Sequence, residues 1–118
     1  MQLQTINLQP YEFTQGDTAA LELVAVDDSG NPINLTGASF STQILGANGV
    51  GSVTFPNGQH SILNASLGQF TLALASGDTA SCGEGANKQI ITTLTIGDII
   101  ETCRGVNLLT VYPPVPTQ

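Results

Sequence analysis

The stretch AALELVAV (residues 19–26) decides the fold class, because it is an almost unbroken apolar run of strand length interrupted by one carboxylate, Glu22. Runs of this length that are rich in Leu and Val are typical of a central strand. The stretch DSGNP (residues 28–32) follows at once and is a dense turn signal. Together they predict a β-protein in which short turns separate the strands.

Alternating patterns elsewhere in the chain support this prediction. Phe40, Thr42 and Ile44 alternate with polar residues, and residues 70–74 repeat the pattern. Period-two patterning places one face of a strand on a core and the other toward solvent. Residues 89–96 and 106–112 have the Ile, Val, Leu and Thr content of further strands. No segment has a convincing helical period.

The turn dipeptides and their spacing indicate the number of strands. Asn-Gly at residues 48–49 and 57–58 and Gly-Asp at residues 97–98 predict tight hairpins, and residues 76–88 are expected to be irregular. Roughly seven to nine short strands with this spacing predict an all-β, immunoglobulin-like antiparallel β-sandwich with extended termini.

One domain is expected in a chain of 118 residues. We expect an extended N-terminal arm at residues 1–10, the sandwich at residues 11–112 and a proline-rich tail at residues 113–118, because proline cannot donate to a sheet ladder. The N-terminus has no signal-peptide pattern, and no apolar run reaches membrane-spanning length. Folding in a cytoplasm is therefore expected.

Charge excludes some partners. Charged residues make up 9% of the chain, and only Lys88 and Arg104 oppose nine carboxylates, so that the net charge is −7. Nucleic-acid binding needs Lys and Arg to neutralise phosphates, and an anionic membrane surface needs them as well. We therefore expect neither a nucleic acid nor a membrane as a partner.

The sequence predicts no catalytic, metal or cofactor site, and thus no enzyme. His60 is the only histidine, and it follows a turn without a nucleophile motif, which favours a surface position. Residues 27–31 resemble the start of a calcium loop, but Pro32 stands where that loop requires glycine. Cys82 and Cys103 are favoured as free thiols, with a bridge between them left open.

The candidate partner contacts lie next to the chain ends. Tyr11 and Tyr112 each adjoin a proline, and they are the two aromatic residues that we expect to be exposed. Pro113 and Pro114 follow Tyr112 and complete the set of candidate contacts.

A family resemblance rests on the order of several segments. A Gly-Asp-Thr entry leads into the first apolar strand, a glycine turn follows, and Leu-Thr-Gly at residues 35–37 leads into the next strand. Residues 67–74, 77–80 and 105–111 continue the pattern. Together they resemble the immunoglobulin-like domain of phage upper baseplate proteins and of small virion accessory proteins.

This resemblance implies a structural protein of the virion, assembled in the host cytoplasm. Baseplate proteins of this kind normally continue into a trimerising stem, and the chain ends after one domain, which favours a capsid decoration (cement) protein. Its expected partner is a phage capsid or tail protein, and a homo-oligomer is expected, with a trimer favoured. The alternatives are a tail- or baseplate-associated structural module and an adhesive, carbohydrate-binding sandwich.

Overall fold

The computed structural model describes residues 2–5, 11–46 and 53–113. Strands dominate these residues, together with one short helix, α1 (Ser76–Ser81), and two 3₁₀ turns, η1 (Asn57–Gln59) and η2 (Ala65–Leu67). No helix in this part of the chain is long and apolar enough to cross a membrane. The strands are β1 (Gln2–Thr5), β2 (Tyr11–Thr14), β3 (Ala19–Val26), β4 (Ala38–Leu45), β5 (Val53–Phe55), β6 (His60–Asn64), β7 (Gln69–Leu74), β8 (Gly85–Ile96) and β9 (Ile99–Tyr112).

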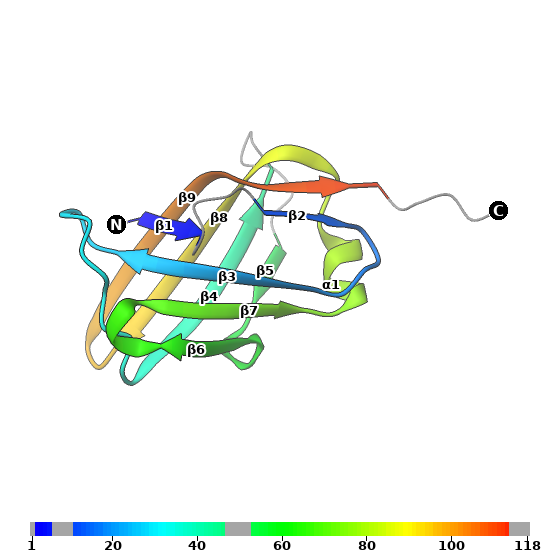
Figure 1. The fold of residues 1–118 in the computed structure, drawn as a ribbon. Coiled ribbons are helices and arrows are strands. Elements are labelled where there is room, and N and C mark those ends of the chain that lie inside the picture. The colour runs from blue at the N-terminus through cyan, green and yellow to red at the C-terminus, as the bar shows by residue number, and fades with distance from the viewer. Residues whose placement is uncertain (1, 6–10, 47–52, 114–118) are drawn as a thin grey trace.

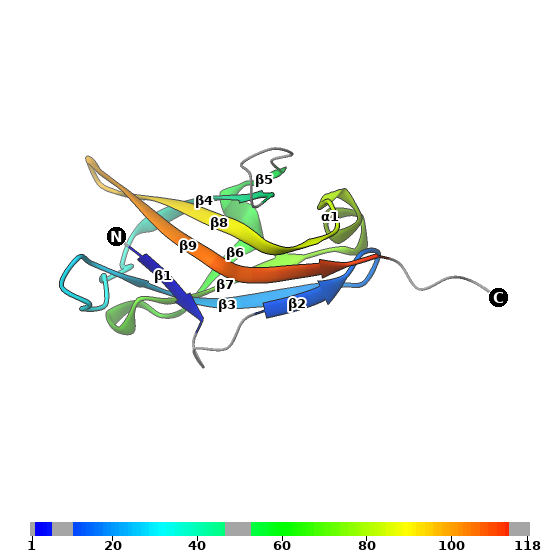
Figure 2. The same cartoon turned by 90° about the horizontal axis from the view of Figure 1, so that it is seen from above.

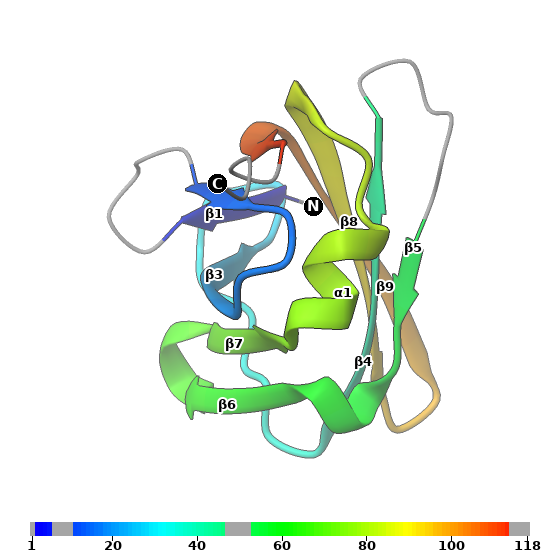
Figure 3. The same cartoon turned by 90° about the vertical axis from the view of Figure 1, so that its right-hand side faces the viewer.

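The strands form two layers, which Figure 3 shows from one end. One layer has the order β1-β3-β7-β6, and the other has the order β5-β4-β8-β9 with β2 on the far edge of β9. The layers join where β1 pairs with β9 at Gln2 and Arg104 (Figures 1 and 2). The first layer corresponds in order to strands A, B, E and D of immunoglobulin domains, and the second corresponds to strands C′, C, F and G. The predicted immunoglobulin-like sandwich is confirmed.

The core lies between the layers and follows the predicted alternation. Phe40 and Ile44 of β4 are buried, and so are Phe70, Leu72 and Leu74 of β7. Leu21 and Leu23 of β3 pack into the same cluster. Fully burying a side chain of this kind contributes about 1.5–3 kcal/mol, so that these inward faces hold the two layers together.

The expected N-terminal arm is corrected in part. Residues 2–5 are a strand of the sheet, because β1 pairs antiparallel with β3 from Gln2 opposite Val26 to Thr5 opposite Leu23. The rest of that arm lies outside the described residues. The sheet is also mixed rather than wholly antiparallel, since both β1 and β2 run parallel to β9.

The connections both confirm and correct the predicted turns. Gly97 and Asp98 form the predicted two-residue hairpin between β8 and β9. Residues 57–58 do not form a hairpin: the 3₁₀ turn η1 leads from β5 in one layer to β6 in the other, and the Asn57 side chain accepts a hydrogen bond from the Phe40 N–H. The Asn-Gly pair at residues 48–49 lies outside the described residues.

The segment expected to be irregular contains the short helix α1. The Asp78 carboxylate accepts hydrogen bonds from the Ala75 N–H and from the Gln59 side chain, at 2.8 and 2.9 Å. An acid in the first turn satisfies a main-chain donor and suits the helix dipole. This local capping explains a helix of 6 residues in a stretch without helical periodicity.

We predict that Gly68→Ala destabilises the fold by about 3 kcal/mol. Gly68 has a φ of 68°, and an added Cβ would lie 2.6 Å from the main-chain oxygen of Ala25. Gly30→Ala is the matched control, because Gly30 also has a positive φ of 84° but has open space around it, which predicts a cost of about 1 kcal/mol. Urea unfolding measures both, and equal losses would contradict the prediction.

Candidate functional site

A shallow groove of about 450 Å³ lies between β2 and β3 and is the candidate binding site. Its size falls within the range of ligand clefts. The groove brings together Tyr11 and Tyr112, the two tyrosines that the sequence singled out. It is lined by Tyr11, Glu12, Phe13, Thr14, Asp17, Thr18, Ala19, Ala20, Leu21 and Tyr112.

The groove exists because the N-terminal strands change layer. β1 pairs with β3 only along Leu23–Val26, whereas β2 pairs with β9 along Leu109–Tyr112. The first half of β3 is therefore left without a neighbouring strand on that edge among the described residues. The two strands that flank the opening belong to different layers.

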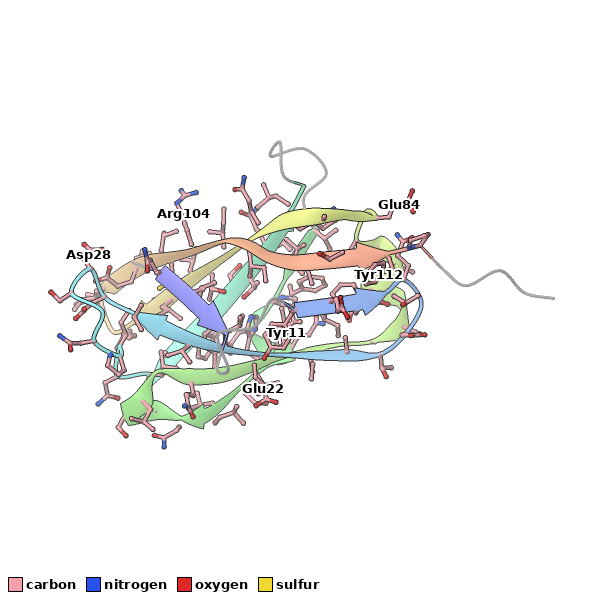
Figure 4. The ribbon with its side chains drawn as sticks, turned by 45° about the horizontal axis from the view of Figure 1, so that its top comes forward. Tyr11, Glu22, Asp28, Glu84, Arg104 and Tyr112 are labelled. Carbon is pink, nitrogen blue, oxygen red and sulfur yellow. The ribbon has the colours of Figure 1, made fainter. Side chains whose placement is uncertain are left out.

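Tyr11 bridges this opening at one end, as Figure 4 shows. Its hydroxyl donates to the main-chain oxygen of Glu22 at 2.6 Å and accepts from the Glu22 N–H at 2.9 Å. A tyrosine hydroxyl can both donate and accept, so that it replaces the main-chain partner that a strand would supply. Burial raises the pKa of Tyr11. Tyr11 is half-buried and not exposed as expected.

Tyr112 lies at the other end of the groove and is exposed, as the sequence predicted. Its side chain is 46% exposed, and its hydroxyl donates to Oε2 of Glu12 at 2.9 Å. The pKa of Tyr112 is raised, first by this hydrogen bond and then by the charge of Glu12. Pro113 is exposed beside it, and Pro114 lies outside the described residues.

The groove is acidic. Glu12 and Asp17 line it, and Glu22 lies beside Tyr11 (Figure 4). Neither basic residue of the chain is among the lining residues: Lys88 is buried, and Arg104 lies opposite β1 on β9. Sequence analysis identified the tyrosines but missed these carboxylates, because they become neighbours only when β2 lies beside β3.

A second surface is the loop end of the sandwich, at the left of Figure 1. Ile99 and Ile100, at the tip of the β8–β9 hairpin, are 58% and 69% exposed. The β6–β7 turn lies at the same end and exposes Leu67, and Ile62 and Leu63 are exposed on β6. Ile99 and Ile100 are adjacent in the chain, and exposed apolar side chains that lie together are a mark of interaction surfaces.

His60 is half-buried, so that the prediction of a surface position is wrong. Its Nε2 lies 2.7 Å from Oγ1 of Thr42, which lies 2.8 Å from Oγ1 of Thr92. Its Nδ1 lies 2.9 Å from the main-chain oxygen of Pro56, and its ring stacks on Phe40. Since both threonine hydroxyls are buried, this chain of hydrogen bonds joins the two layers.

The cysteines are free and buried, as the sequence favoured. Burial raises the pKa of Cys103 to about 11 and also raises that of Cys82. A thiol with a raised pKa is a poor nucleophile at neutral pH. In the part of the chain that the structure describes, no group of three or more His, Cys, Asp or Glu could hold a metal ion.

No family model matches the chain, and no curated protein matches its sequence.

We predict that Tyr11→Phe lowers the free energy of unfolding by about 1–2 kcal/mol, because it leaves the N–H and C=O of Glu22 without their partner. Tyr112→Phe is the control: its hydroxyl meets only an exposed carboxylate, and the free energy of unfolding should stay nearly unchanged. Chemical denaturation measures both variants. A loss as large in the control would show that Tyr11 has no special role.

We predict that His60 makes the fold less stable below about pH 6.5, the usual pKa of an unfolded-chain histidine. Burial lowers the pKa of His60 in the folded protein. The unfolded chain therefore binds the proton first, and stability falls as the pH drops from about 6.5 toward the folded pKa.

His60→Gln removes the titrating group and serves as the comparison. Unfolding free energies measured from pH 8 to pH 5 should decline less steeply in the variant than in the wild type. Parallel curves for the two proteins would disprove the assignment to His60.

Proposed function

We propose that the chain is a non-catalytic structural subunit of a phage particle, which attaches to the assembled shell as a capsid decoration protein. Three features support the proposal: the resemblance in residues 15–38 and 67–74, the immunoglobulin-like order of strands and the two contact surfaces described above. The subunit works by contact. Its role is to bind neighbouring subunits and to stabilise their assembled form.

The observation that carries this proposal is the apolar tip of the β8–β9 hairpin. Ile99 and Ile100 are adjacent in sequence and are each more than half exposed. Covering them in a contact removes apolar surface from water, which contributes about 1–2 kcal/mol for each side chain. A hairpin projects this surface from the end of the domain (Figure 2), where it can enter a recess between shell subunits.

Attachment of this kind stabilises a shell by linkage. A ligand that binds the assembled form and not the free subunits shifts the equilibrium toward assembly. Many copies on one shell multiply a modest contact energy. The proposal includes a homo-oligomer, with a trimer favoured, in which linked subunits bind with higher avidity than single ones.

An adhesive, carbohydrate-binding role is the second candidate, and the groove is the observation that favours it. Tyr112 offers an exposed ring at the edge of the groove, and Glu12 and Asp17 offer hydrogen-bond acceptors. A glycan array tests this role, because Tyr112→Ala should abolish a true signal. A tail- or baseplate-associated module is distinguished by binding to isolated tails and not to shells.

We predict that the purified chain co-sediments with assembled shells of the phage whose genome encodes it, and that Ile99→Asp/Ile100→Asp weakens this binding roughly a hundredfold. Ser41→Asp/Thr54→Asp is the matched control, because it adds the same charge at exposed positions of β4 and β5, outside the hairpin. Light scattering measures the oligomeric state. A monomer that binds neither shells nor tails at any salt concentration would refute the proposal.

A further inference from the structure

We infer that the groove between β2 and β3 binds an extended, basic segment of a partner protein, which adds as a strand to the free edge of β3 at Ala20. The inference rests on the proposed function, since it names a way in which this subunit holds a neighbour. It concerns a different surface from the hairpin tip.

The free edge of β3 follows from the alternation of main-chain directions. The Ala25 N–H donates to Gly68 on the β7 side, and successive residues of a strand direct their N–H and C=O groups to opposite edges. The N–H and C=O groups of the even-numbered residues of β3 therefore face the groove. Glu22 confirms this, because both of its main-chain groups bind the Tyr11 hydroxyl there.

Ala20 is the next residue on that edge. Its N–H and C=O face the groove and have no hydrogen-bond partner among the described residues. Its side chain is small and exposed, and Thr18 beside it is exposed as well. The main chain at Ala20 is therefore flanked by small side chains, while Tyr11 occupies the neighbouring position of this edge at Glu22.

The opposite wall of the groove offers one unpaired position, at Glu12, because the main-chain oxygen of Thr14 already accepts from the Asp17 N–H. The Gln15 N–H donates to the main-chain oxygen of Tyr112. The N–H and C=O groups of odd-numbered residues of β2 therefore face β9, and those of Glu12 face the groove. Unpaired edges of this kind are templates for strand addition, which proteins use to recognise extended peptides.

Charge identifies the occupant. Proteins protect free edges with charged residues, most often lysine, but the charges in this groove are the carboxylates of Glu12 and Asp17. They repel an acidic strand and attract one that carries Lys or Arg. A second copy of this chain fits poorly, because it has a net charge of −7 and only two basic residues, of which Lys88 is buried.

The test uses an array of eight-residue peptides in which Lys, Thr or Glu alternates with Val. We expect the lysine series to bind, the threonine series to bind more weakly and the glutamate series not to bind. Amide hydrogen exchange should slow at Ala20 in the complex, because its N–H gains a partner. An array without binding at about 1 mM, or binding without protection at Ala20, would overturn the inference.

Backbone methylation separates strand addition from attraction by charge alone. In a bound strand, alternate amides face the edge of β3 and the others face away. Methylating the first set should abolish binding, whereas methylating the second set should change the affinity by less than about twofold. Equal effects of the two sets would overturn the inference.

Protein variants test the carboxylates. Glu12→Gln/Asp17→Asn keeps the shape and should weaken binding of the lysine peptide about fivefold at low salt. Asp98→Asn/Glu101→Gln is the matched control on the β8–β9 hairpin and should bind normally. If both pairs weaken binding equally, the groove is not the site, and a glycan signal that depends on Tyr112 would assign it to sugar instead.

Shell binding distinguishes a failure of this inference from a failure of the proposed function. If shells bind the wild-type protein but no peptide binds, the inference about the groove is refuted and the capsid role stands. If lysine peptides bind and protect the Ala20 amide from exchange, but shells and tails do not bind, the capsid role is refuted and the inference about the groove stands.

Discussion

The short pairing of β1 with β3 is the constraint on which the rest of this structure depends. β1 covers only Leu23–Val26, and the chain then returns as β2 on the edge of β9. Because each strand edge accepts one neighbour, the first half of β3 must satisfy its main chain in another way. Tyr11 does so at Glu22. The mixed sheet, the groove and the position of Tyr112 beside Glu12 all follow from this change of layer.

β9 separates the two proposed contact surfaces. The strand has 14 residues from Ile99 to Tyr112, which corresponds to roughly 45 Å of extended chain. The apolar hairpin tip lies at its first end, and the acidic groove lies at its last. The proposed capsid role uses both ends, so that one subunit contacts two neighbours of different chemistry. In these proposals the apolar tip supplies contact energy, while the groove supplies directional main-chain pairing and selects by charge.

The sequence predicted the parts of the fold that depend on local pattern. The bounds of β3 agree with residues 19–26, and the inward faces of β4 and β7 were correct because alternation is a property of a single strand. The expected final strand, residues 106–112, is only the second half of β9, which continues through Arg104 and Gly105 without a turn. The groove was not predictable, since it depends on which edge β2 joins, and Tyr11 carries no local sign that its hydroxyl meets Glu22.

Thr42 shows what an alternating pattern predicts about a side chain and what it does not. Its place between Phe40 and Ile44 predicts an inward side chain, and the hydroxyl is indeed fully buried. A buried hydroxyl requires a partner, but the pattern does not say which. The partners are Thr92 from β8 and His60 from the opposite layer, which lie 50 and 18 residues away in sequence. The same pairing takes His60, the one residue suited to acid–base chemistry near neutral pH, into a structural contact between layers. His60 and the two threonines therefore form a polar contact within a mainly apolar core, and this contact fixes how the two layers pack.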